Sequence, residues 1–94
     1  MIVLLAAAVC RVTDAGFQDI DCAALDANRI YDTLARVCGD IFDHRRSSVV
    51  ENPTAEDFYG MVASVSLGLS ANDQLIIYFS GHADEKEGMA RLLF

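Results

Sequence analysis

Two apolar segments, residues 2–9 and 74–79, constrain most strongly how this chain can fold. A short apolar run without alternating polar residues is typical of a β-strand that is covered on both faces. Such strands occur mainly in parallel sheets, which carry helices on both sides. The segment between them contains two stretches with the apolar spacing of helices, so the chain is predicted to have an α/β fold.

The first helix is predicted over residues 22–38, where apolar residues recur at steps of three and four. Asp21 is in position to cap its start. Gly39 is in position to end it, because glycine tolerates the left-handed conformation of a closing residue. The predicted buried face consists of Ala24, Ala27, Ile30, Tyr31, Leu34 and Cys38.

A second strand is predicted over residues 47–51, and Asn52-Pro53 ends it. Thr54 and Asp57 then resemble a capping box that opens a second helix. Its predicted buried face consists of Phe58, Met61, Val62, Val65 and Leu69, and Gly68 closes it. After the third strand, at 74–79, we expect a polar loop over 83–88 and a short final strand from residue 91.

Strand, helix, strand, helix and strand, joined by right-handed crossovers, give a three-layer α/β/α open parallel sheet. We expect one domain spanning residues 1–94. In such sheets, functional residues gather at the carboxyl ends of the strands, near the point where the strand order reverses. His82 follows the third predicted strand directly and is therefore the leading candidate for a functional side chain.

Composition excludes several classes of function. The formal net charge is −7, with only seven Lys and Arg residues, which argues against nucleic-acid binding because phosphate contacts need clustered basic residues. Arg45-Arg46 is predicted to be part of a solvated turn.

The three cysteines have no CxxC spacing and an odd count, so we expect reduced thiols in a cytoplasmic protein, with no disulfide framework, no zinc site and no cofactor.

The apolar start of the chain has two interpretations. It resembles the core of a secretory signal, but it lacks a basic flank, and it is too short to span a membrane. A buried first strand is the favoured interpretation. No other segment approaches the length of a membrane span, so no membrane association is expected.

The end of the third strand carries residues suited to acid–base chemistry. A neutral imidazole at His82 can accept a proton from a thiol or hydroxyl near pH 7. Gly81 allows a sharp backbone turn, and the amides after the strand can stabilise a developing oxyanion. A single histidine after a strand can equally be structural.

Tyr78-Phe79-Ser80-Gly81-His82 resembles the histidine motif of caspase-like cysteine peptidases, especially the metacaspase and bacterial branch. In the same order as in that family, three further segments are similar to its sequence features: 22–27 to the opening of its first helix, 51–54 to the end of its second strand, and 92–94 to the strand after the histidine loop. The resemblance therefore spans almost the whole chain.

The resemblance implies a cysteine endopeptidase that acts on protein or peptide substrates through a Cys–His dyad. His82 would be the general base, and the backbone at Gly81 and Ala83 would contribute to the oxyanion site. Asp26 matches an aspartate that, in metacaspases, helps to line the pocket for a basic side chain; alternatively, it is a carboxylate that stabilises the start of a helix. The family's glycine after the histidine is Ala83 here.

The nucleophile is expected outside this chain. Caspase-type sequences place the cysteine about 50 residues after the histidine, but only 12 residues follow His82, and Cys10, Cys22 and Cys38 all precede it. We therefore expect a fragment, or a truncated and inert product, that is inactive alone. The third strand would lack a neighbour, so self-association through the open sheet edge is also predicted.

Two other functions remain open. A catalytically inactive caspase-like module that binds protein partners would have the same motif without the cysteine. A receiver or flavodoxin-type domain is disfavoured, because the chain has Ser-Gly-His rather than an aspartate after the third strand and no glycine-rich phosphate loop after the first.

His44 is predicted to be a surface histidine, and Asp84, Glu85 and Glu87 are predicted to lie in a solvated loop without metal-ligand spacing.

Overall fold

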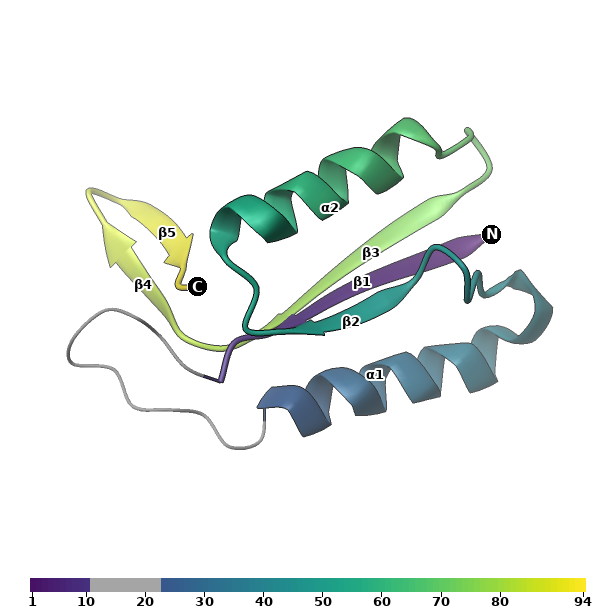
Figure 1. The fold of residues 1–94 in the computed structure, drawn as a ribbon, viewed down its shortest axis with the longest axis horizontal. Helices are drawn as coiled ribbons and strands as arrows, with labels where there is room; N and C mark the ends of the chain where they lie inside the picture. Colours follow the sequence, from purple (N-terminus) through teal and green to yellow (C-terminus); the bar gives the residue numbers. More distant parts are fainter. Residues whose placement is uncertain (11–22) are drawn as a thin grey trace.

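The computed structural model describes residues 1–10 and 23–94, and these form a small α/β domain (Figure 1). Every predicted helix and strand up to Ser80 is present, with bounds within about two residues of those expected. The predicted loop over 11–19 and the predicted cap at Asp21 lie outside the described residues. The elements are β1 (Ile2–Ala8), α1 (Ala23–Cys38), a 3₁₀ turn (Gly39–Ile41), β2 (Ser48–Glu51), α2 (Ala55–Leu67), β3 (Gln74–Ser80), β4 (Ala83–Lys86) and β5 (Met89–Leu92).

The sheet has the strand order β2-β1-β3, and all three strands are parallel. The helices α1 and α2 lie on opposite faces of this sheet (Figure 1). This arrangement follows from the topology, because the chain moves from β1 to one side and then crosses to the other, and right-handed crossovers put the two helices on different faces. The predicted three-layer parallel architecture is confirmed.

The central strand β1 supplies the core on both faces. Every residue from Val3 to Val9 is at most 1% exposed. Leu4, Ala6 and Ala8 pack in a cluster with α1, whereas Leu5 and Ala7 pack in a cluster with α2. Alternation along a strand sends successive side chains to opposite faces, so the absence of polar residues in β1 reflects helix cover on both sides.

The helix ends agree with the sequence signals. The Thr54 hydroxyl accepts a hydrogen bond of 3.0 Å from the Asp57 amide, as the capping pattern predicted. Gly39 follows α1 with a φ of +55°, the left-handed conformation expected of a closing glycine. Gly68 caps α2 with a φ of −93°, so this glycine is not needed for a left-handed turn.

The Ser47 hydroxyl completes the hydrogen bonding of β1. It accepts a hydrogen bond of 2.9 Å from the buried Leu4 amide, just before β2 begins to pair with β1. We expect Ser47→Ala to lower the free energy of unfolding by about 1–3 kcal/mol, because a buried amide would be left without a partner. Urea denaturation of Ser47→Ala and Ser47→Thr measures this; an equal loss in both would contradict the explanation.

The predicted polar loop over 83–88 is wrong. The strands β4 and β5 form an antiparallel hairpin, and Ala83 pairs with Leu92. The two loop residues, Glu87 and Gly88, have φ values of +54° and +78°, as a type I′ turn requires. Glutamate at its first position is an uncommon choice, so the turn signal in the sequence is weak. The final strand accordingly begins at Met89 rather than at residue 91.

Arg46 takes part in an ion-pair network at the amino-terminal end of the sheet. Its guanidinium contacts Asp43 at 2.5 Å and Asp73 at 3.2 Å, and it donates a hydrogen bond to the Gly68 carbonyl. Asp43 also accepts hydrogen bonds from the amides of Arg45 and Arg46. The predicted turn is therefore present, but Arg46 joins it to the loop before β3 rather than projecting into solvent.

This network makes the stability of the chain depend on pH. A hydrogen bond from the Ser70 amide, then those from Arg46 and the chain's amino group, hold the pKa of Asp73 well below its usual range. A depressed carboxyl pKa stabilises the folded state above the unfolded-state pKa, about 3.9, and this contribution is lost as the pH falls further. We therefore expect Arg46→Gln to lower the melting temperature at pH 7, and the effect to shrink only as the pH falls through the depressed folded-state pKa of Asp73. Melting curves of both proteins from neutral pH into the acid range measure this, and an effect that stays constant through the acid transition would contradict it.

Within residues 1–10 and 23–94, no helix is both long enough and apolar enough to cross a membrane.

Candidate functional site at the carboxyl edge of the sheet

The candidate site lies where the three parallel strands end. β1 continues into Cys10, β2 into Asn52, and β3 into Gly81 and His82. Because β1 is central and its neighbours are β2 and β3, the strand order reverses beside β1. In open α/β sheets this reversal, at the carboxyl ends of the strands, is where ligands bind. The carboxyl edge is therefore the natural position for a site in this fold.

His82 is the histidine that the structure places at this edge. It lies between β3 and the hairpin, and its side chain is half-buried. Its carbonyl accepts a hydrogen bond of 2.9 Å from the Leu93 amide, which ties the hairpin to the end of β3. The residue is neither enclosed in the core nor fully solvated.

Gly81 is required for close packing rather than for a left-handed turn. A Cβ atom at this position would lie 3.2 Å from the Val9 Cβ and 2.8 Å from the Phe79 ring. The chain bends at this residue, and its φ is not positive. Close approach of the two strand ends is the physical reason for glycine here.

The backbone amide of Ala83 points away from the partner strand of the hairpin. The hydrogen bond from Leu93 to His82 makes these two residues a hydrogen-bonded pair, and such pairs alternate with non-hydrogen-bonded pairs along an antiparallel ladder. Ala83 and Leu92 are the next pair, so the Ala83 amide points away from β5. Ala83 also has no positive φ, and alanine is therefore compatible with this position.

Asp26 lies in the first turn of α1. This helix begins near the carboxyl edge of the sheet, on the face opposite to α2 (Figure 1). Asp26 is half-buried, whereas the neighbouring Ala23 and Ala27 are fully buried against the sheet. The position fits both a carboxylate that stabilises the helix start and one that faces a ligand at the edge.

Two residues at this edge, Asn52 and Cys10, were not predicted from the sequence as site residues. Asn52 accepts a hydrogen bond of 2.9 Å from the Cys10 amide, and its own amide donates to the Ala8 carbonyl at 2.7 Å. Its φ of +48° is left-handed, a conformation that asparagine tolerates better than most residues. An asparagine directly after a strand and before proline was the available signal. The sequence pattern around Cys10 does not distinguish it from the other two cysteines.

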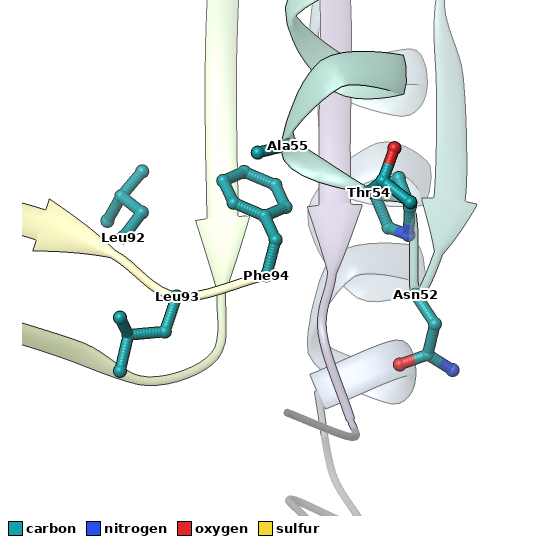
Figure 2. A pocket seen from close by; sticks show the side chains of 7 residues that line it. Asn52, Thr54, Ala55, Leu92, Leu93 and Phe94 are labelled. Atoms are coloured by element: carbon teal, nitrogen blue, oxygen red, sulfur yellow. The ribbon is translucent and has the colours of Figure 1, made fainter. Parts of the chain in front are cut away.

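A cavity of about 510 Å³ opens between the start of α2 and the end of the chain. Figure 2 shows Phe94 lying between β3 and the start of α2, with Leu92 and Leu93 on the neighbouring segment. The Phe94 ring contacts the rings of Phe58 and Phe79. The cavity is lined by Asn52, Pro53, Thr54, Ala55, Leu92, Leu93 and Phe94.

The acidic stretch of the hairpin contains an ion pair across the two strands. Asp84 is paired with Arg91 on the opposite strand at 2.7 Å, and this hydrogen bond lowers the pKa of Asp84. Across residues 1–10 and 23–94, no group of three or more His, Cys, Asp or Glu side chains has the arrangement of a metal site. His44 is exposed, as predicted, and lies against the rings of Tyr31 and Phe42.

Comparison of the chain with models of protein families, with characterised proteins and with solved structures finds no match.

Proposed function

We propose that this chain is the amino-terminal part of a caspase-like cysteine endopeptidase domain, with His82 as the general base. The observation that supports this most directly is the position of His82. It follows β3 at the carboxyl edge of a parallel sheet, beside the point where the strand order reverses. The histidine motif provides an imidazole that can act as a base. The carboxyl edge of the sheet is a location suited to binding a substrate.

In this proposal, the His82 imidazole removes the proton of a cysteine thiol, and the sulfur attacks the carbonyl carbon of a peptide bond. The nucleophilic cysteine comes from polypeptide beyond this chain, on a strand adjacent to β3. The Ala83 amide, directed away from β5, is a donor for the oxyanion that forms on the carbonyl oxygen. The imidazolium then returns the proton to the departing amine.

The proposed substrate is a protein or peptide with a basic residue before the scissile bond. Asp26 is the proposed contact for that residue, because a half-buried carboxylate at the carboxyl edge attracts a cation more strongly than a fully solvated one. The net charge of −7 acts in the same direction, since it favours the approach of cationic substrates.

The decisive test is the reading frame after codon 94, together with the activity of its product. We expect an apolar strand followed by a cysteine, and a product that cleaves fluorogenic peptides after Arg or Lys. Replacing that cysteine by alanine should abolish cleavage. A reading frame that continues without such a cysteine would overturn the peptidase proposal and favour a catalytically inactive module that binds protein partners.

We also expect the isolated chain to self-associate through β3. Within the described residues this strand pairs only with β1, it contains no charged residue, and Ile76 and Ile77 are 36% and 50% exposed on opposite faces. Unprotected edges of this kind pair with other chains. Sedimentation velocity should show oligomers that Ile77→Lys reduces and that Tyr59→Lys, on the exposed face of α2, does not. A monomeric wild-type chain at high concentration would contradict this.

A further inference from the structure

We propose that the cavity between the start of α2 and the hairpin, here termed the hairpin groove, binds an aromatic side chain of a peptide that also carries basic residues. This inference deepens the proposed function, on which the identity of the peptide as a substrate rests. Binding of the peptide does not require cleavage, so the two proposals fail separately. Binding without cleavage would overturn only the peptidase, and cleavage without binding in the groove would overturn only the inference made here.

The hairpin groove borders the candidate site. Asn52 lines it on one side and accepts a hydrogen bond of 2.9 Å from the Cys10 amide, which follows β1. Leu93 lines it on the other side, and its amide donates a hydrogen bond of 2.9 Å to the His82 carbonyl, which follows β3. A peptide that lies across the carboxyl edge of the sheet therefore reaches the groove without leaving the site.

An aromatic ring forms the floor of the hairpin groove. Figure 2 shows Phe94 between β3 and the start of α2. Its ring centroid lies 5.8 Å from that of Phe58, which is buried, and 5.2 Å from that of Phe79. Phe94 is itself only partly buried. A further ring that enters the groove can extend this cluster in the edge-to-face or offset arrangements that aromatic pairs favour.

The walls of the groove are apolar and come from two elements. Pro53 and Ala55 contribute from the start of α2, and Leu92 contributes from β5. Leu92 is 51% exposed, so part of its side chain is open to a ligand. The volume of about 510 Å³ is within the range of about 300–1,000 Å³ that is typical of ligand pockets. The groove is therefore suited to a large apolar side chain.

The register of the hairpin sorts its charges onto two faces. Glu85 pairs with Ala90, and Ala90 and Leu92 project from the same face of β5, because side chains alternate along a strand. Glu85 therefore shares the face that contributes Leu92 to the groove. The two basic residues of the hairpin, Lys86 and Arg91, project from the other face. The face toward the groove is thus acidic.

The helix side of the groove is acidic as well. Glu51 and Glu56 flank the lining segment 52–55, and both are exposed. Carboxylates on both sides attract cationic groups that stand next to the bound ring in the peptide. Exposed ion pairs contribute little to affinity, so the apolar contact supplies most of it and the charges select among peptides.

The test is fluorescence anisotropy of a fluorescein-labelled peptide, Gly-Lys-Phe-Lys-Gly, titrated with the 94-residue chain, whose monomeric fraction is confirmed by sedimentation. We expect it to bind roughly tenfold or more tightly than the same peptide with alanine in place of phenylalanine, because the burial of the ring is lost. Replacing both lysines by glutamate should also weaken binding, and high salt should reduce this difference. Equal binding of the phenylalanine and alanine peptides would overturn the proposal.

A pair of substitutions on α2 locates the binding site. Ala55→Leu fills the groove and should weaken binding of the phenylalanine peptide by roughly tenfold or more. Ala63→Leu is the same change on the same helix, outside the residues that line the groove, and should leave the affinity unchanged. Both alanines are exposed, so both variants should fold, which circular dichroism checks. Equal affinities of the two variants would show that the peptide binds elsewhere.

A second pair separates the charge at the groove from the net charge of the chain. Glu85→Lys should weaken binding several-fold, whereas Asp40→Lys, in the exposed turn after α1 at the other end of the sheet (Figure 1), should have a smaller effect. Equal effects would contradict a role for the groove's own carboxylates. NMR signals of the Leu92 and Leu93 methyl groups should shift on addition of peptide. A shift with chain concentration alone would mean that a second copy occupies the groove, and would overturn the choice of partner.

Discussion

Leu5→Ala should lower the free energy of unfolding of this chain by about 2–5 kcal/mol, the range found for buried leucines. Leu5 is only 1% exposed and packs with Ala7 and Phe58 between β1 and α2. The strand that carries Leu5 is fixed by pairing with β2 on one side and with β3 on the other. The surrounding structure therefore cannot collapse into the space that the side chain leaves. For a domain of ordinary stability, about 5–15 kcal/mol, this loss is a substantial fraction of the total.

The measurement is urea denaturation followed by far-ultraviolet circular dichroism, with the monomeric fraction confirmed at each concentration. Leu67→Ala is the matched control, because Leu67 ends α2 and is 90% exposed. We expect its effect to stay within about 0.5 kcal/mol, as for most surface substitutions. If the two variants lost the same stability, β1 would not be the centre of the core.

The parts of the fold that follow from local patterns could be predicted from the sequence. The unbroken apolar run of β1 indicates a strand with cover on both faces, and the burial of Val3 to Val9 confirms this. The helical spacing in α1 and the capping residue Thr54 likewise determine structure over a few residues, and the structure contains both features. Periodicity and capping are local properties, which explains why a single sequence is enough to recognise them.

The hairpin could not be predicted in the same way. β4 contains Asp84, Glu85 and Lys86, and its burial is low along its length, so it lacks the apolar alternation that marks a half-buried strand. Its pairing with β5 depends on the turn at Glu87-Gly88 and on the ion pair between Asp84 and Arg91. These interactions connect residues across the turn, and composition alone does not indicate which charges will pair.

The candidate site was predicted only at the strand end that carries a motif. His82 is the histidine that the motif indicates, whereas Cys10 and Asn52 reach the same edge through strand register and not through any spacing in the sequence. Arg46 is a similar case. An Arg-Arg pair in a turn predicts solvent exposure, but the partners Asp43 and Asp73 lie on opposite sides of it in the chain and meet it only in the folded state.

In the proposed peptidase, His82→Ala should lower kcat/KM for a peptide substrate by about 10²–10⁴-fold, the contribution typical of a positioned general base. KM should change little, because the imidazole acts on the proton of the nucleophile and not on the bound peptide. His44→Ala is the matched control, since His44 is exposed and lies against the rings of Tyr31 and Phe42, away from the carboxyl edge of the sheet. It should keep the activity of the unmodified protein. Stopped-assay kinetics on both variants, with folding checked by circular dichroism, measure this. Equal activity of the two variants would mean that the imidazole at the end of β3 does not take part in peptide hydrolysis.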